Sequence, residues 1–229
     1  MQPVRTLGQF VEDEQLLPWI AGTVAEIIRH AGHAAEKRGK RRSLTVSCTT
    51  CKATKTCCWS TVVARLYEGV IIADELVRAG RDTPALRELL SARAEAMEAT
   101  PPQEWRTPCV FLDERERCTV YGVRPVPCGA LLVYTDPVRC TTRAGEILGY
   151  VSSEEHAAAT AFEEPFRERL SLRKKVGRRY LGVLPRMVLV ALEAWDRTDF
   201  RDYLRQLPWP SDEELARWSR PEAPGTPAP

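Results

Sequence analysis

The eight cysteines of this chain fall into two groups whose spacing suits metal binding. The first group reads Cys-x2-Cys-x5-Cys-Cys and comprises Cys48, Cys51, Cys57 and Cys58, and the second comprises Cys109, Cys118, Cys128 and Cys140. A Cys-x2-Cys pair lets a tight turn aim two sulfurs at one point, as a tetrahedral thiolate site requires. Thiolates are soft ligands that select zinc, copper(I) or iron–sulfur clusters over magnesium or calcium. The pattern therefore predicts a metal centre with all eight cysteines as candidate ligands.

The vicinal pair Cys57 and Cys58 leaves alternatives open, because successive side chains diverge and do not easily bind one ion together. One of the two is a spare thiol, a ligand to a second metal or a redox partner. Cys58 also precedes an expected helix, whose N-terminus favours a thiolate. Fully ligated zinc would be structural, whereas six to eight thiolates also suit two metals, an iron–sulfur cluster or a transfer site.

Disulfides and unconnected core thiols are the competing interpretations of the cysteines. Disulfides suit small secreted domains, but Glu12, Asp13 and Glu14 interrupt the N-terminal region before any apolar stretch that could act as an export signal. Unconnected thiols would not place four cysteines within eleven residues. No run of eighteen apolar residues is present, so we expect no membrane span and a cytoplasmic location.

A family resemblance rests on the second cysteine group. Residues 108–113 read Pro-Cys-Val-Phe-Leu-Asp and residues 118–128 read Cys-Thr-Val-Tyr-Gly-Val-Arg-Pro-Val-Pro-Cys. With the cluster at 48–58, this order resembles the CxxCxxCC family of zinc- or iron-chelating domains (YkgJ-like cysteine-cluster proteins). The chain has five residues, 52–56, where the family name describes two between the second cysteine and the vicinal pair. The resemblance implies a metal more firmly than an activity.

The elements around the cysteines are predicted to be mainly α-helical. Apolar residues at helical spacing predict helices over 17–35 and 59–77, and Pro84 opens a third that continues to about Glu98. We expect the second and third of these to form an αα-hairpin that returns the chain to the metal. Short strands are expected over 110–112 and 119–121, forming a small β-hairpin in which Cys109 faces Cys118, and another over 131–134. Prolines predict an extended approach to Cys128.

Helical patterns return in the C-terminal part of the chain. They cover 154–175, 180–196, 199–206 and 211–219, with a kink or early break expected at Pro185. We expect a single domain over 1–220, with a metal-binding region at 44–142, a C-terminal helical region at 153–220 and a disordered proline-rich tail at 221–229. The 229 residues are 44% hydrophobic, enough for a real core.

Charge and missing motifs restrict the function. Lys+Arg 33 against Asp+Glu 31 leaves a net charge of +2, so the basic stretches 37–42 and 167–179 are interpreted as solvated faces and a nucleic-acid partner is not expected. The histidine pair His30 and His33 is interpreted as a polar helix flank. No Gly-x-Gly-x-x-Gly, Walker loop, His-Glu-x-x-His or Gly-x-Ser-x-Gly is present, which argues against conventional dinucleotide enzymes and hydrolases.

Two functions remain open from the sequence. The first is a cytosolic binding or interaction module that holds zinc or iron, with an unidentified protein partner. The second is an iron–sulfur enzyme, with a [4Fe-4S] cluster, that performs redox or protein-modification chemistry; flagellin lysine methylases carry a similar cysteine cluster, but this chain shows no glycine-rich S-adenosylmethionine loop. The binding module is favoured slightly.

Overall fold

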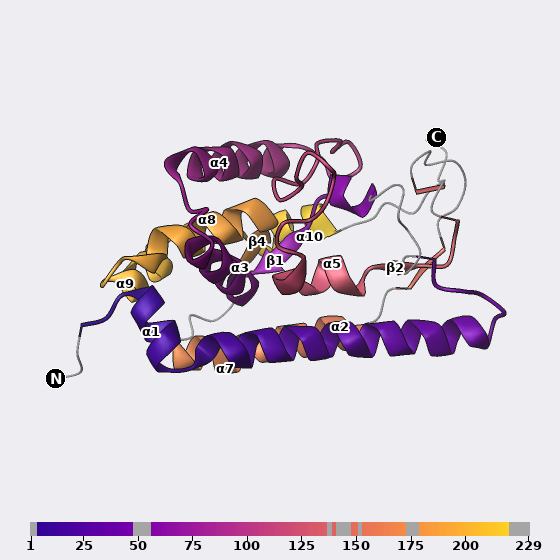
Figure 1. Ribbon diagram of the computed structural model, residues 1–229, viewed down its shortest axis with the longest axis horizontal. Coiled ribbons are helices and arrows are strands. Elements are labelled where there is room, and N and C mark those ends of the chain that lie inside the picture. Colours follow the sequence, from indigo (N-terminus) through magenta and orange to yellow (C-terminus); the bar gives the residue numbers. More distant parts are fainter. Residues whose placement is uncertain are drawn as a thin grey trace.

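The computed structural model describes residues 4–47, 56–136, 139–140, 148–150, 153–172 and 179–219. The fold is mainly α-helical, as predicted, and contains two small antiparallel two-stranded sheets (Figure 1). The predicted tail at 221–229 lies outside the described residues. In the part of the chain that is described, no helix is both long enough and apolar enough to cross a membrane.

Two helices open the chain. Helix α1 (Leu7–Asp13) begins at a capping box in which the Thr6 and Gln9 side chains each accept from the other residue's backbone amide. Helix α2 (Leu16–Lys40) confirms the helix predicted over 17–35 and extends it by one residue at its start and five at its end. It runs along one side of the molecule (Figure 1) and presents its apolar stripe, with Ile20, Val24 and Ile27 buried, to the core.

The centre of the fold is a pair of strand–helix units that pack against each other. Strand β1 (Val63–Arg65) runs directly into α3 (Leu66–Arg78), and β4 (Leu181–Val183) runs directly into α8 (Leu184–Trp195). The strands pair antiparallel with Ala64 opposite Gly182 at the middle. Beyond each strand the ladder continues symmetrically, since Leu66 N–H donates to Tyr180 O and Leu184 N–H donates to Val62 O, both at 2.8 Å. The two units are therefore joined by equivalent hydrogen bonds at both ends of the paired strands.

The helices predicted over 59–77 and 180–196 thus begin later than expected. A short 3-10 turn, η2 (Thr56–Trp59), and strand β1 occupy the start of the first, and β4 occupies the start of the second. Pro185 neither kinks nor breaks α8, because it lies in the first turn, where its missing N–H has no intrahelical acceptor to lose. The β-branched residues at 61–63 favour the extended backbone that the helical pattern obscured.

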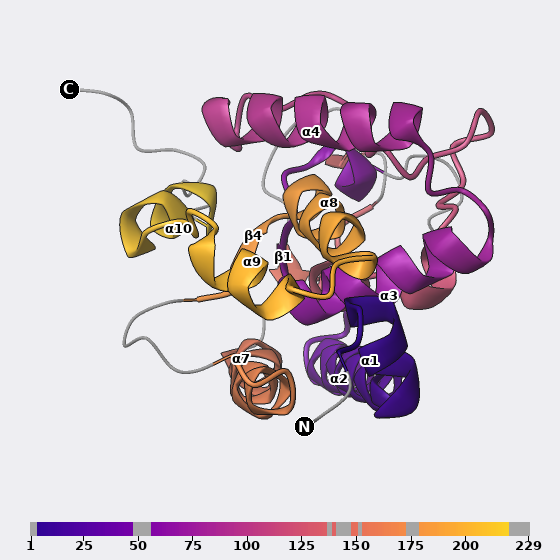
Figure 2. The ribbon, with the colours of Figure 1, turned by 90° about the vertical axis from the view of Figure 1, so that its left-hand side faces the viewer.

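Helices α3 and α8 approach closely at Gly69. A Cβ at that position would lie 2.4 Å from the Met187 carbonyl oxygen, so only glycine permits the contact. Helix α4 (Pro84–Ala99) is confirmed in position, with a Thr83 cap and Pro84 in the first turn, but it packs on α8. Figure 2 shows α8 lying between α3 and α4, so the predicted αα-hairpin is wrong. The Arg186 guanidinium joins α8 to α4 through both Glu98 oxygens, at 3.0 and 2.8 Å.

The remaining helices complete the C-terminal region. Helix α7 (Ser153–Arg169) confirms most of the prediction over 154–175 and accommodates Pro165 inside it. It lies beside α2 (Figure 2) and buries Phe162 and Phe166 against Tyr67 of α3. Helices α9 (Phe200–Gln206) and α10 (Asp212–Ser219) confirm the last two predicted helices within a residue.

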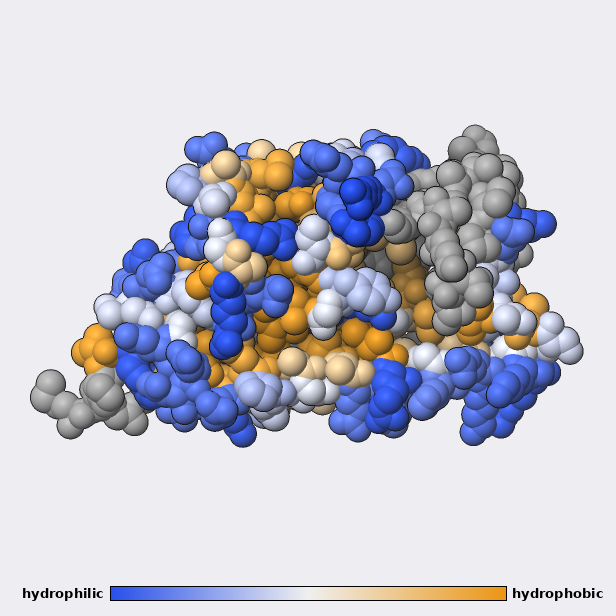
Figure 3. Space-filling model, in the orientation of Figure 1, coloured by the Kyte–Doolittle hydropathy of each residue, from blue (hydrophilic) through white to orange (hydrophobic). Residues whose placement is uncertain are grey.

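The segment between α4 and α7 departs most from expectation. Residues predicted as strands 110–112 and 119–121 form a tight hairpin with a single bridge, Leu112 to Cys118. A 3-10 turn, η3 (Tyr121–Val123), and a short helix, α5 (Val126–Ala130), follow it, so the approach to Cys128 is helical after an extended Pro125. Strand β2 (Leu132–Val133) confirms the strand predicted over 131–134 and pairs with β3 (Gly149–Tyr150). Figure 3 shows the molecule from the same side as Figure 1. Apolar residues cover the middle of that surface, and hydrophilic residues lie along α2.

Candidate metal centre

The two cysteine groups meet at a backbone hydrogen bond. Cys57 and Cys58 lie in η2, and Cys109 lies in the loop that follows α4. The Cys109 N–H donates to the Cys58 carbonyl oxygen at 2.7 Å, which closes the chain between the groups into a loop containing β1, α3 and α4. The fold thus places the vicinal pair Cys57–Cys58 next to the first cysteine of the second group, as a shared metal centre requires.

The hairpin after Cys109 places Cys118 on the same side of the fold. Thr119 N–H donates to Phe111 O at 2.8 Å, and Asp113 N–H donates to Arg117 O at 2.9 Å. The Asp113 carboxylate accepts from the Arg117 and Arg115 amides and from the Arg117 guanidinium, and these bonds lower the pKa of Asp113. The turn is therefore held by its own side chain. The bridge pairs Cys118 with Leu112, so Cys109 does not lie directly opposite Cys118 as predicted, although desolvation and the charge on Cys118 together raise the pKa of Cys109.

Cys128 is carried by α5, which is fixed on both sides of that residue. Two positions before it, the Val126 amide donates to the buried Glu68 carboxylate at 2.7 Å. One position after it, Gly129 lies so close to Ile28 of α2 that a Cβ would come within 2.5 Å of the Ile28 Cδ1. Cys128 itself donates its amide to Pro125 O at 3.0 Å.

The vicinal thiols ionise unequally. Interaction between the two neighbouring thiols lowers the pKa of Cys57 to about 6 and raises the pKa of Cys58. The charge on the Arg124 guanidinium, which stacks over the Tyr121 ring at 4.2 Å, also lowers the pKa of Cys57. The two thiols therefore titrate as a pair that loses its first proton more readily than its second, and which of them binds a metal stays a prediction.

The other three thiols resist ionisation. Desolvation raises the pKa of Cys109 and Cys118, and it raises the pKa of Cys128 well above its ordinary value, although part of the Cys128 residue is exposed to solvent. Neighbouring sulfurs add to the effect, since negative charge on Cys57 and Cys109 opposes ionisation of Cys128. Five thiols from both groups therefore lie within electrostatic reach of one another: Cys57, Cys58, Cys109, Cys118 and Cys128.

The described side chains do not by themselves form a finished metal site. Within the described ranges, no three His, Cys, Asp or Glu side chains make a group that could hold a metal ion as they stand. Cys48 and Cys51 lie outside the described residues. Cys140 is described and half-buried. Ligation by the eight cysteines therefore stays a prediction.

A small apolar cavity lies directly beside Cys58 and Cys109. Its volume is about 20 Å³, room for about one water molecule. Met97 of α4, Trp105 and Leu184 of α8 are among the residues that line it. Apolar packing on this side of the two cysteines excludes bulk water and contributes to the raised pKa of the Cys109 thiol.

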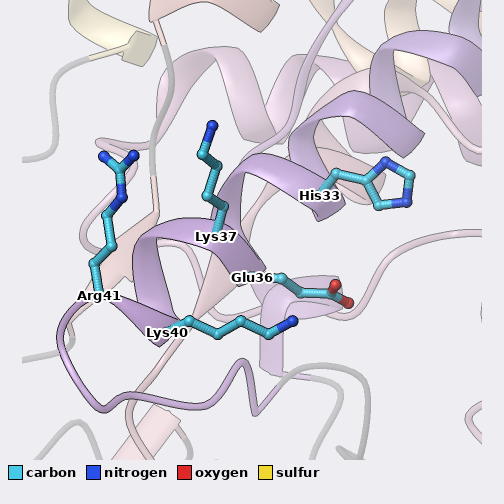
Figure 4. A pocket seen from close by; sticks show the side chains of 5 residues that line it. All are labelled: His33, Glu36, Lys37, Lys40 and Arg41. Atoms are coloured by element: carbon cyan, nitrogen blue, oxygen red, sulfur yellow. The ribbon is translucent and has the colours of Figure 1, made fainter.

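The histidine pair lies on the exposed side of α2. His30 is 62% exposed, with its Nε2 3.6 Å from Glu26 Oε1, as expected of a polar flank. His33 borders an open surface hollow of about 320 Å³ whose other lining residues are Glu36, Lys37, Lys40 and Arg41. Figure 4 shows Lys37 and Arg41 extending to one side of the helix, while Glu36 and Lys40 extend in a different direction. None of the described cysteines lines this hollow.

Two residues that position the cysteines were not singled out from the sequence: Glu68 and Gly129. A signal for Glu68 is present, because it is the one acid in the apolar run from Val62 to Ala73. An acid inside such a run is expected to be buried and paired. Gly129 carries no comparable signal. Glycine is needed there because the Ile28 side chain, which is distant in the sequence, lies where a Cβ would be.

Comparison with known families confirms the resemblance over this region. Residues 47–142 match the family model CxxCxxCC, described as a "putative zinc- or iron-chelating domain". The matched segment begins immediately before Cys48 and ends two residues beyond Cys140, so it contains both cysteine groups. No curated protein and no solved structure matches the chain.

The donor set fits the metals in the family description. All the gathered donors are sulfur, which suits zinc and iron–sulfur centres and disfavours magnesium and calcium. They come from two segments that the Cys58–Cys109 hydrogen bond holds together. None of the six cysteines that the structure describes is part of a disulfide, so their sulfurs can serve as metal ligands.

Proposed function

We propose that this protein binds zinc or iron through its two cysteine groups and acts as a binding or interaction module. The observation that carries the proposal is the gathering of Cys57, Cys58, Cys109, Cys118 and Cys128 from two segments more than fifty residues apart. A shared cation would offset the mutual repulsion of these thiolates, which is a physical reason for bringing them together.

The ligands in this proposal come from both groups. Cys48 and Cys51 supply the Cys-x2-Cys half, and Cys58, Cys109, Cys118 and Cys128 supply the rest, with Cys57 and Cys140 as further candidates. No disulfide joins the six described cysteines, which is in keeping with a reducing compartment, and we place the protein in the cytoplasm. Zinc bound by four thiolates would hold the fold and a partner surface in place, because zinc catalysis needs an open position.

Metal content per chain tests the proposal. Protein purified without oxygen and analysed by elemental mass spectrometry should contain one or two zinc ions, or iron, per chain. About four irons with a cluster absorption spectrum would instead favour an iron–sulfur enzyme. Absence of both metals from the purified protein and after reconstitution would contradict the proposal.

Paired substitutions then test the shared site. Cys109→Ser with Cys118→Ser should remove most of the bound metal, because these thiols lie in the gathered set. Cys140→Ser is the comparison variant and should cost less metal, since Cys140 lies outside the hairpin and the helix α5 that carry Cys109, Cys118 and Cys128. Unchanged metal content in the double variant would show that the two groups do not share a site.

A further inference from the structure

Glu68 is a fully buried carboxylate with both oxygens in use. It lies in the first turn of α3, with 0% of its surface exposed. Its Oε2 accepts from the Arg65 amide at 2.6 Å and its Oε1 accepts from the Val126 amide at 2.7 Å. The first bond is local and caps α3, whereas the second spans 58 residues and reaches α5.

Capping alone does not account for a carboxylate at this depth. A buried charge is costly unless several hydrogen bonds satisfy it, and the same burial raises the pKa of Glu68. Helix α4 is capped without that cost by the Thr83 hydroxyl, which accepts from the Leu86 amide near the surface. A short capping side chain such as threonine could not also accept the second hydrogen bond, from the Val126 amide.

The second bond is needed because α5 is too short to hold itself. A helix of five residues has little stability of its own, so tertiary contacts decide where its side chains point. Glu68 fixes Val126 on one side of Cys128, and the close approach of Gly129 to Ile28 fixes the other side. Cys128 thus lies between two anchors, on α3 and α2.

We infer that Glu68 is a positioning residue for the metal centre, which orients the Cys128 thiol by clamping the amide of Val126. This inference rests on the proposed function, in which Cys128 is a ligand. Groups that orient metal ligands through hydrogen bonds typically change metal affinity 10- to 100-fold when they are replaced. Glu68 also ties the centre to the strand–helix unit of β1 and α3, because it bonds the Arg65 amide at the same time.

Glu68→Gln is the test variant, because it keeps size but leaves a donor facing one of the two amides. Glu75→Gln is the matched control, since it makes the same change at an exposed position of the same helix. With Zn²⁺ as the probe in competition with a chelating dye, Glu68→Gln should bind about 10- to 100-fold more weakly than wild type. Glu75→Gln should match wild type. Equal affinity of Glu68→Gln and wild type would overturn the inference.

A double variant separates positioning from a general loss of structure. In the Cys128→Ser variant the Glu68 carboxylate has no thiol to orient. Adding Glu68→Gln to that variant should therefore weaken Zn²⁺ binding by less than about threefold relative to Cys128→Ser alone. Additive losses would overturn the positioning role while leaving the proposed function intact. Failure of wild type to bind Zn²⁺ or iron would overturn the proposed function itself, and the inference with it.

A metal-free measurement and a second variant guard against a folding defect. Hydrogen exchange of the Val126 amide should be at least tenfold faster in metal-free Glu68→Gln than in Glu75→Gln. Val126→Pro deletes the donor while keeping Glu68 and its bond to Arg65, and the extended Pro125 (φ −68°, ψ 159°) accepts a following proline. This variant should show the same loss of Zn²⁺ affinity, and wild-type affinity in it would overturn the inference.

Discussion

The amide of Cys109 and the carbonyl oxygen of Cys58 share a 2.7 Å hydrogen bond, although the two residues belong to different cysteine groups. The bond holds the backbone at Cys109 beside the backbone at Cys58. The distance between the two thiols is therefore limited by the backbone as well as by the side-chain rotamers. A metal bound across it would close the same loop a second time, and metal binding and folding should then be coupled.

Metal removal should therefore destabilise the protein. A ligand that binds only the folded state at one hundred times its Kd contributes about 2.7 kcal/mol to the free energy of unfolding. Chelation of purified, metal-loaded protein should lower the thermal midpoint, measured by circular dichroism, and re-addition of the metal should restore it. In the Cys109→Ser, Cys118→Ser variant the midpoint should not respond to chelator. A wild-type midpoint that is insensitive to chelator would contradict the coupling.

Gly69→Ala should loosen the contact between α3 and α8. The new Cβ would lie 2.4 Å from the Met187 carbonyl oxygen, a backbone atom that cannot rotate away. We expect the free energy of unfolding to fall by about 1–3 kcal/mol, measured by urea denaturation. Gly22→Ala in α2 is the matched control, because nothing lies within 4 Å of its Cβ position and alanine favours a helix by up to about 1 kcal/mol. Equal effects of the two substitutions would argue against the close approach.

Tyr67→Phe should weaken the attachment of α7 to α3. The buried Tyr67 hydroxyl donates to the Ala159 carbonyl oxygen at 3.1 Å. Its removal should cost about 1 kcal/mol in unfolding free energy and should increase hydrogen exchange in α7. Tyr121→Phe is the control, because Tyr121 is 63% exposed. Removal of its hydroxyl should change neither the unfolding free energy nor the hydrogen exchange in α7. A Tyr67→Phe protein as stable as wild type would show that the bond adds nothing.

Glu68 should make stability depend on pH in the metal-free protein. Desolvation raises its pKa above the ordinary 4.5, and the charges facing it are those of Arg65, which lowers the pKa, and Glu163, which raises it. The folded protein then holds a proton that the unfolded chain releases, so this contribution is complete below about pH 4.5 and is lost as pH rises through the folded pKa. Each unit of the shift corresponds to about 1.4 kcal/mol.

The measurement is the unfolding free energy of wild type minus that of Glu68→Gln, taken from pH 4 towards neutral. The difference should become less favourable to wild type as pH rises, because glutamine has no proton to lose. If this difference instead becomes more favourable to wild type as pH rises, the hydrogen bonds from the Arg65 and Val126 amides stabilise the charged carboxylate by more than desolvation destabilises it.

The sequence alone determined the class of the fold and most helices. Helices over 17–35, 84–98, 199–206 and 211–219 were predicted because their apolar periodicity, caps and prolines are local signals. It also determined the composition of the candidate centre, since cysteine spacing is a property of the chain, and the family match over 47–142 confirms the resemblance.

Tertiary structure alone decided the pairing of β1 with β4. Each strand has three residues and its partner lies more than one hundred residues away, so no local pattern distinguishes it from the helix that follows. The insertion of α8 between α3 and α4 is likewise a packing outcome, permitted by Gly69. The position of Cys128 depends on Glu68 and Ile28, because a five-residue helix takes its orientation from what it touches and not from its own sequence.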